Sequence, residues 1–145
     1  MSRDDATTTG DGQPTEMVKV KPRKVLVVDD DDIIREVAKV ALEVVGGWHV
    51  DTAVSGDEAS RLAAVDQPDV VLLDVMMPAL DGPSTAALLR ADPLTRDVPV
   101  IFLTAKTPLT DDQLEAVPNL VGVITKPFDP MDLAAEIRRL AGWEE

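Results

Sequence analysis

Three carboxylates stand where two short apolar runs of the sequence end. Asp29 and Asp30 follow the run 25–28, and Asp74 follows the run 70–73. Carboxylates that share one site repel each other unless a cation joins them. A hard cation such as Mg²⁺ takes a few carboxylate ligands together with waters and phosphate oxygens. Because a free aspartate has a pKa of about 3.9, an ionised Asp74 is also available as a nucleophile at neutral pH.

A hydroxyl and an ammonium group follow two further apolar runs. Thr104 comes after the run 98–103, and Lys126 comes shortly after the run 121–124. Phosphoryl transfer depends mainly on positioning and on neutralising charge. A lysine, as a point-charge donor, and a threonine hydroxyl are groups that hold phosphoryl oxygens. Together with the carboxylates they predict a site where a phosphoryl group is transferred to Asp74.

Five short strands are predicted to carry these residues. The runs 25–28, 70–73, 98–103 and 121–124 are apolar without interruption, which is typical of parallel strands buried on both faces. A weaker, alternating run, 49–53, indicates a strand at a sheet edge.

Helical patterns lie between the strands. Residues 34–45 and 133–141 repeat their apolar side chains at helical spacing. Residues 55–58 and 110–113 fit the capping-box pattern of a helix start, and Asp31 favours a helix N-terminus. Five consecutive β–α units predict an α/β fold with a doubly wound parallel sheet, in which ligands bind beyond the carboxyl ends of the strands.

Composition narrows the classes of function. The chain has 145 residues, the size of one domain, with no Cys and one His. Disulfides, thiolate metal sites and His-cluster metal sites are therefore excluded, and any metal must have oxygen ligands. The net charge of −13 argues against nucleic acid or anionic membrane as a direct partner. The sequence has no apolar run of the ~18 residues that a membrane span needs and no signal-peptide pattern, which predicts a cytoplasmic protein.

The first part of the chain differs in composition from the rest. Residues 1–21 are polar and contain few large apolar groups, so they cannot bury enough surface to offset the entropy of ordering. We predict a flexible tail over 1–21 and a folded domain over 22–145. The folded part carries the acidity, with 23 acidic against 11 basic residues. A basic cluster between residues 19 and 24 is interpreted as a solvated lead-in.

Four motifs occur in order between residues 24 and 141. They are Val-Leu-Val-Val-Asp-Asp, Pro-Asp-Val-Val-Leu-Leu-Asp-Val-Met-Met-Pro with Asp81-Gly82, Val-Pro-Val-Ile-Phe-Leu-Thr-Ala-Lys, and Thr-Lys-Pro-Phe. With these motifs the sequence resembles the receiver domains of bacterial two-component response regulators, in the stand-alone form of chemotaxis regulators. The resemblance implies a flavodoxin-like fold of five parallel strands in the order 2-1-3-4-5 with five helices.

The resemblance also implies the roles of the site residues. These are Asp74 as phosphoacceptor; Asp29, Asp30, Asp74 and the backbone carbonyl of Met76 as Mg²⁺ ligands; Thr104 as the switch hydroxyl; and Lys126 as the phosphate-binding lysine. The phosphodonor would be a phosphohistidine on a sensor histidine kinase or a phosphotransfer protein, and the downstream target an unknown protein. The chain ends soon after its last helix, so we expect no fused output domain. We expect no turnover enzyme, although self-dephosphorylation fits the chemistry.

The sequence departs from the family at the position three residues before Lys126. An aromatic residue is usual there, but this chain has Val123 and contains no Tyr. An aromatic switch at this place is therefore not available. Thr107-Pro108 interrupts the start of the fourth helix, where the family often docks partners. Met76 and Lys106 occupy the positions that tune hydrolysis of the acyl phosphate in the family.

Two other functions remain open at this point. A degenerate receiver would bind partners without ever being phosphorylated, although its Asp, Thr and Lys set is complete. A phosphatase of the haloacid-dehalogenase type would use the Asp-x-Asp pattern of residues 29–31. That class completes its metal site with an acidic pair after the fourth strand, which this sequence lacks, and the chain has no room for a cap domain.

Overall fold

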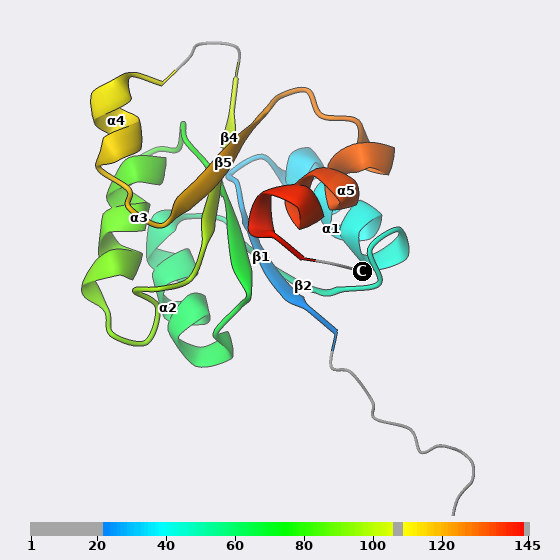
Figure 1. Cartoon of the computed structure of the whole chain (residues 1–145), viewed down its shortest axis with the longest axis horizontal. Helices are drawn as coiled ribbons and strands as arrows, with labels where there is room; N and C mark the ends of the chain where they lie inside the picture. Colours follow the sequence, from blue (N-terminus) through cyan, green and yellow to red (C-terminus); the bar gives the residue numbers. More distant parts are fainter. Residues whose placement is uncertain (1–21, 106–108, 144–145) are drawn as a thin grey trace, which may run out of the picture.

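The computed structural model describes residues 22–105 and 109–143, in which five strands alternate with five helices (Figure 1). The strands are β1 (Lys24–Val28), β2 (His49–Ala53), β3 (Val70–Asp74), β4 (Val100–Thr104) and β5 (Leu120–Thr125). The helices are α1 (Asp32–Val44), α2 (Gly56–Asp66), α3 (Gly82–Ala91), α4 (Asp111–Glu115) and α5 (Pro130–Ala141). The predicted tail over 1–21, Lys106 and the Thr107-Pro108 interruption lie outside the described residues.

The strands form one parallel sheet in the order β2-β1-β3-β4-β5. The predicted flavodoxin-like α/β fold with five strands and five helices is therefore confirmed. The chain reverses its direction of travel across the sheet between β1 and β3. In doubly wound sheets such a reversal opens a crevice beyond the carboxyl ends of the two strands, and ligands bind there.

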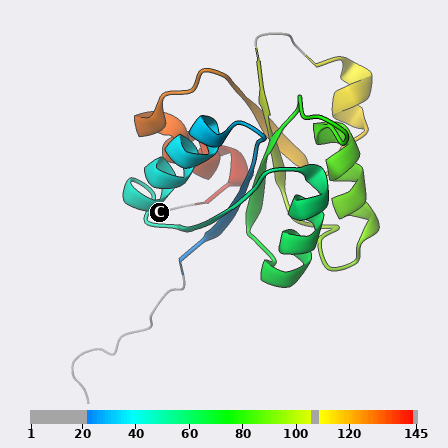
Figure 2. The ribbon, with the colours of Figure 1, turned by 180° about the vertical axis from the view of Figure 1, so that it is seen from behind.

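Helices cover both faces of the sheet (Figure 2). Successive side chains of a strand point to opposite faces. In β1, Val25 and Val27 join a core beneath α1 and α5, whereas Leu26 and Val28 join a second core beneath α2 and α3. These two apolar layers fix the sheet between the helices and thereby fix the level at which each strand ends. No helix in the described part of the chain is long and apolar enough to cross a membrane.

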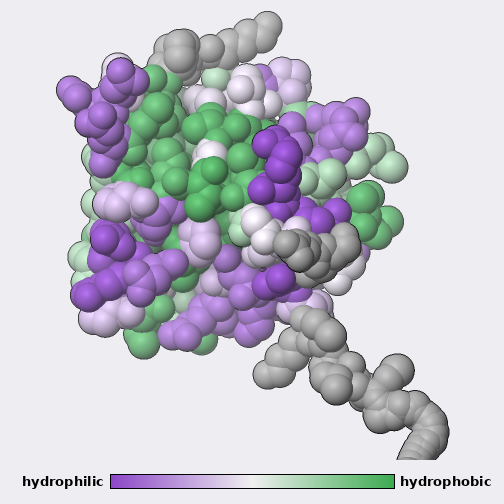
Figure 3. All heavy atoms as spheres, viewed as in Figure 1, coloured by the Kyte–Doolittle hydropathy of each residue, from purple (hydrophilic) through white to green (hydrophobic). Residues whose placement is uncertain are grey.

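The prediction of strand burial holds at the centre of the sheet and fails at β5. Every residue of β3 and β4 is buried, and β2 lies at an edge as expected. The run 121–124 was expected to be buried on both faces, but β5 is the other edge of the sheet. Val121 and Val123 stay 37% and 40% exposed, because the short helix α4, five residues long, does not cover them. Apolar residues gather on the surface around β5 and α4 (Figure 3).

The helix starts follow the predicted caps in most cases. Asp31 caps α1 by accepting hydrogen bonds from two backbone N–H groups in its first turn. Thr110 and Gln113 form a complete capping box at α4. The box predicted at α2 is only half formed. Ser55 accepts from the backbone N–H of Glu58, but the Glu58 carboxylate accepts from Val54 instead of from Ser55.

The two tryptophans meet at the end of the domain where β1 begins and α5 finishes. The rings of Trp48 and Trp143 pack edge to face with their centroids 5.1 Å apart. The guanidinium of Arg23 lies 4.7 Å from the centre of the Trp143 ring, and that of Arg138 lies 5.4 Å from the Trp48 ring. Cation–π contacts of this kind add to the apolar packing. The cluster joins the first and last described segments of the chain.

The burial of side chains in the core beneath α1 and α5 leads to a prediction for the free energy of unfolding. Leu72 is fully buried at the centre of β3, whereas Leu94 is 58% exposed in the loop after α3. We expect Leu72→Ala to lower the free energy of unfolding by about 2–5 kcal/mol, because it leaves a cavity two residues from Asp74. Leu94→Ala serves as the control and is expected to stay within about 0.5 kcal/mol of wild type. Denaturant unfolding measures both, and equal losses would contradict this assignment of the core.

Candidate functional site

Strand register brings the three carboxylates together. Val28 of β1 is paired with Leu73 of β3, so the aspartates that follow leave neighbouring strands at the same level. Carboxylate oxygens of Asp29, Asp30 and Asp74 lie within 4.8 Å of one another. Asp29 and Asp74 are buried, at 0% and 3% exposure, whereas Asp30 is exposed. We call the carboxylates of Asp29, Asp30 and Asp74 the acidic floor of the site. Two of them are buried and that of Asp30 is open to solvent.

Lys126 reaches this floor from the edge strand. Its ammonium Nζ lies 2.9 Å from Asp29 Oδ2 and 3.2 Å from Asp74 Oδ1. The backbone N–H of Lys126 donates to the carbonyl of Thr104 at 2.7 Å, which holds the lysine at the end of β4. The ammonium thus compensates two buried carboxylates that would otherwise repel each other.

Thr104 and Met76 border the same floor. Thr104 is the last residue of β4 and is buried, and its neighbour Leu103 is paired with Asp74. The backbone N–H of Met76 donates to Asp74 Oδ1 at 3.4 Å, while its side chain is largely exposed. The main chain of Met76 therefore belongs to the site and its thioether to the surface. The predicted roles of the Met76 carbonyl and of the Thr104 hydroxyl stay predictions.

Backbone contacts hold the β1–α1 loop that presents Asp29. Asp29 Oδ1 accepts a hydrogen bond from the N–H of Asp31 at 2.9 Å. The guanidinium of Arg35 donates to the carbonyl of Asp29 at 2.7 Å and is also paired with Asp32. Arg35 was missed in the sequence. The sequence feature that could have indicated Arg35 is its position in the first turn of the helix that follows the acidic run 29–32.

Gly82 is a second residue whose role the sequence did not reveal. Its N–H donates to the carbonyl of Val75 at 2.9 Å. A Cβ atom at Gly82 would lie 2.8 Å from both the carbonyl oxygen of Asp74 and the Cα of Val75. Any side chain there would displace the main chain of the phosphoacceptor candidate. The signal available was the glycine directly after Asp81, which caps α3.

The ionisation of the site differs from that of free side chains. Burial, and then the neighbouring charge of Asp29, raise the pKa of Asp74 to about 6, against the opposing effects of Lys126 and of the Met76 N–H. Burial alone would lower the pKa of Lys126, but its contacts with Asp29 and Asp74 outweigh burial and raise the pKa. Asp74 is therefore less acidic than the sequence suggested, yet mostly ionised at neutral pH.

The acidic floor suits a hard divalent cation. Within residues 22–105 and 109–143, it is the one group of three or more potential ligands close enough to share an ion. Asp29 Oδ2 is buried and receives no directed hydrogen bond from the described residues, so the Lys126 ammonium is its only compensation there. Carboxylate oxygens with one side open to water match the preference of Mg²⁺. The donor set therefore fits the predicted metal.

Comparison with known proteins shows the family to which the sequence is similar. Residues 25–138 match the family described as the response regulator receiver domain. The chain is 36% identical over 117 residues to the DNA-binding dual master transcriptional regulator RpaA of Synechocystis, covering 81% of this chain and 48% of that protein. It is 41% identical over 118 residues to the DNA-binding response regulator MtrA of Mycobacterium tuberculosis, covering 80% of this chain and 49% of that protein. The chain thus spans about half the length of these curated relatives.

Solved structures agree with the fold. The chemotaxis protein CheY4 of Vibrio cholerae superposes with a TM-score of 0.75 at 30% identity, covering 82% of this chain and 98% of that one. The receiver domain of the sensor histidine kinase PA1611 of Pseudomonas aeruginosa gives a TM-score of 0.72 at 30% identity, covering 83% and 98%. That structure has a magnesium ion coordinated in its active site cleft.

The raised pKa of Asp74 predicts a pH dependence of stability. The folded protein holds this proton more tightly than the unfolded chain, whose carboxyl has the ordinary value of 3.8. The stabilisation is fully present below about pH 4 and is lost as the pH rises through about 6. We therefore expect Asp74→Asn, which cannot ionise, to gain roughly 2–3 kcal/mol relative to wild type between pH 4 and pH 7.

Denaturant unfolding of both proteins in EDTA at the two pH values measures this difference. Asp97→Asn is the matched control, because Asp97 is 92% exposed and pairs only at 3.8 Å with Arg90. Its difference from wild type should not change between the two pH values. An Asp74→Asn difference that is equally independent of pH would contradict the raised pKa.

Proposed function

This chain belongs to the response regulator receiver domain family, and on that premise we propose that it accepts a phosphoryl group on the carboxylate of Asp74. The observation that supports the proposal is the convergence of three carboxylates and the Lys126 ammonium at the carboxyl ends of the strands. Lys126 Nζ lies 3.2 Å from Asp74 Oδ1. Structural aspartates that only cap helices, such as Asp129 at α5, lack such company.

The transfer proceeds by substitution at phosphorus. An oxygen of the Asp74 carboxylate attacks the phosphorus of a phosphohistidine, a P–O bond forms, and the P–N bond breaks. The imidazole nitrogen leaves with the electron pair of that bond and takes up a proton. Mg²⁺, held by Asp29, Asp30, Asp74 and the carbonyl of Met76, would supply neutralisation of the phosphoryl charge when bound.

Lys126 and Thr104 then respond to the new group. The ammonium that pairs with Asp74 before transfer pairs with a phosphoryl oxygen afterwards, and the Thr104 hydroxyl donates to another. Shifting an equilibrium from 1:99 to 99:1 needs about 5.5 kcal/mol. Each hydrogen bond to a charged group supplies roughly 1.5–3 kcal/mol, so two or three such bonds are of the right size. With Val123 on β5, this switch operates without an aromatic side chain at that position.

The partners follow from the chemistry of the donor. A sensor histidine kinase or a phosphotransfer protein carries the phosphohistidine, and a protein target reads the phosphorylated face. The protein stores a signal and does not turn over a substrate, although water can release the phosphoryl group. RpaA and MtrA are named as DNA-binding regulators. For this chain, the lack of direct nucleic-acid binding and the cytoplasmic location stay predictions.

Intact-mass spectrometry tests the phosphoacceptor. With Mg²⁺ and a small phosphodonor such as acetyl phosphate, we expect the chain to gain the mass of one phosphoryl group. Asp74→Ala should abolish the gain, because it removes the only nucleophile proposed. Asp97→Ala, at an exposed position remote from the cluster, should retain it. A mass gain that survives Asp74→Ala would refute this assignment.

Calorimetry in the absence of any phosphodonor tests the metal site. We expect Mg²⁺ to bind once, and Asp29→Asn or Asp30→Asn to weaken binding at least tenfold, a loss of about 1.4 kcal/mol, by removing a charged ligand. Asp32→Asn is the control, since Asp32 lies in the same acidic run but has a side chain that is 89% exposed and pairs with Arg35. No binding at millimolar Mg²⁺ would favour the degenerate receiver instead.

A further inference from the structure

One basic side chain of helix α1 turns toward the acidic loop instead of toward solvent. The guanidinium of Arg35 is always charged, yet the side chain is only 14% exposed. Its Nη1 donates to the backbone carbonyl of Asp29 at 2.7 Å, and its Nη2 pairs with the carboxylate of Asp32. A charged side chain is rarely withdrawn from water this far unless its donors are used. These two contacts therefore account for the burial of Arg35.

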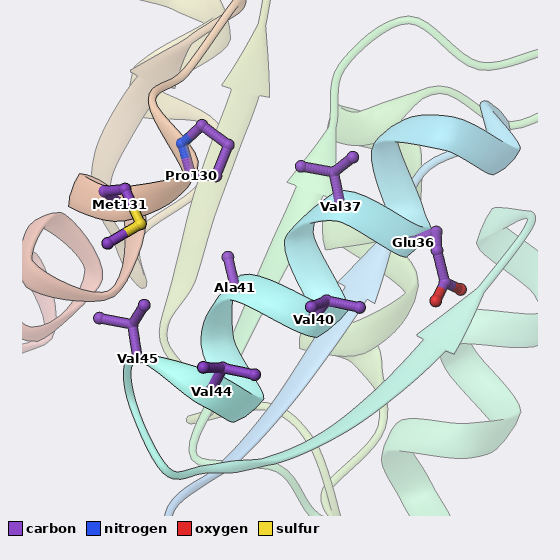
Figure 4. Close-up of a pocket in the computed structure, with 8 residues that line it drawn as sticks. All are labelled: Glu36, Val37, Val40, Ala41, Val44, Val45, Pro130 and Met131. Atoms are coloured by element: carbon purple, nitrogen blue, oxygen red, sulfur yellow. The ribbon is translucent and has the colours of Figure 1, made fainter.

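The neighbours of Arg35 on its own helix set this direction. Asp32, three positions earlier, attracts the guanidinium, whereas Lys39, four positions later, repels it and has its own partner in Glu43 at 2.8 Å. The side of α1 that faces the start of α5 is lined mainly by valines (Figure 4). Glu36 also lines that side, but it directly follows Arg35, so the two side chains do not face each other. The guanidinium is thereby directed to the loop before α1.

The carbonyl of Asp29 needs a partner from outside the sheet. Val28 is the last residue of β1 that is paired with β2 or β3, so the carbonyl of Asp29 lies beyond the ladder of the described strands. Asp29 is 0% exposed. A buried carbonyl without a partner costs free energy comparable to a lost hydrogen bond. Arg35 supplies that hydrogen bond.

Asp29 is thus held at each of its polar atoms. Its N–H donates to the carbonyl of Ala53 at 3.2 Å, and its Oδ1 accepts from the N–H of Asp31 at 2.9 Å. Its Oδ2 lies 2.9 Å from Lys126 Nζ. Lys126 contacts a carboxylate oxygen that a bound Mg²⁺ would need, whereas Arg35 contacts the main chain and leaves both carboxylate oxygens available.

We propose that Arg35 is a positioning residue for the Mg²⁺ site. By holding the carbonyl of Asp29, it fixes the direction in which the Asp29 carboxylate enters the acidic floor. This inference rests on the Mg²⁺ site of the proposed function. It adds a residue that touches neither the metal nor the phosphoryl group and acts through Asp29.

The charge of Arg35 makes the sign of its effect decisive. A guanidinium near the acidic floor repels a divalent cation, so by charge alone its removal should strengthen Mg²⁺ binding. By positioning, its removal should weaken Mg²⁺ binding, because the Asp29 carboxylate loses its fixed direction. Groups that orient metal ligands typically contribute roughly ten- to hundredfold in metal affinity. The two effects of removing Arg35 are therefore opposite in sign, and the positioning effect is expected to be the larger.

Calorimetric titration of the full chain with Mg²⁺, without any phosphodonor, separates the two effects. Arg35→Met removes the charge and the donors but keeps an unbranched side chain. Lys39→Met is the matched control, because it removes one charge from the same helix and Lys39 pairs with Glu43 instead of with the loop. We expect Arg35→Met to bind Mg²⁺ about tenfold more weakly than wild type, and Lys39→Met to bind at least as tightly as wild type. Denaturant unfolding in EDTA checks that both variants are folded. If Arg35→Met bound Mg²⁺ as tightly as Lys39→Met, the proposal would be overturned.

Amide exchange measured by NMR in EDTA gives a readout that needs no metal. The N–H of Asp31 donates to Asp29 Oδ1, so its exchange rate reports how firmly that carboxylate is held. We expect the Asp31 amide to exchange several times faster in Arg35→Met than in wild type or Lys39→Met, while the amide of Leu72 keeps its wild-type rate. An unchanged Asp31 rate in Arg35→Met would also overturn the proposal. If the wild-type chain bound no Mg²⁺, the proposed function would fail at its metal site, and the Asp31 rate alone would decide whether Arg35 positions Asp29.

Discussion

Asp29 and Asp74 lie buried on neighbouring strands, and their mutual repulsion has to be compensated for the surrounding loops to keep one arrangement. Lys126 provides that compensation from the end of β5, which lies two strands from β3 and three from β1. It can do so only because β5 is aligned with β4 so that Lys126 follows directly beyond Thr104. An uncompensated buried charge is strongly destabilising. The electrostatics of the site therefore constrain the register of the edge strand β5. A shift of β5 against β4 would move the Lys126 ammonium away from the two carboxylates.

The strand ends were predictable because uninterrupted apolar runs identify buried parallel strands and their last residues. These runs predict that Asp29, Asp74, Thr104 and Lys126 lie at one rim of the sheet, the end where the parallel strands finish. The same signal misjudged β5, since an apolar run does not reveal whether a helix covers it. The sequence also could not show that the Glu58 carboxylate accepts from the N–H of Val54 rather than from that of Ser55. Nor could it show that Gly82 packs against the main chain of Asp74. Both contacts are local in sequence, between Val54 and Glu58 and between Gly82 and Asp74, but they depend on the path of the backbone in the turns before α2 and α3, which residue types alone do not specify.

The two edges of the sheet are protected in different ways. β2 carries Asp51, and a charged side chain on an edge strand discourages edge-to-edge pairing with another chain. β5 has no charged residue, and its exposed side chains are those of Val121, Val123 and Thr125. Hydrophilic residues lie beside the apolar area in Figure 3. The neighbouring helix α4 carries Asp111, Asp112 and Glu115, and the net charge of −13 supplies repulsion at longer range. Solubility of the domain therefore depends on net charge more at one edge than at the other.

The tryptophan cluster has a consequence for spectroscopy. The chain contains two Trp and no Tyr, so essentially all of its near-ultraviolet absorbance at 280 nm arises from one edge-to-face pair. That pair joins the β2 side of the sheet to the end of α5, at the pole away from Asp74. Intrinsic emission and near-ultraviolet dichroism will thus follow the seating of α5 and the melting of this pole. Events at the acidic rim will be optically silent unless they are transmitted through the length of the domain.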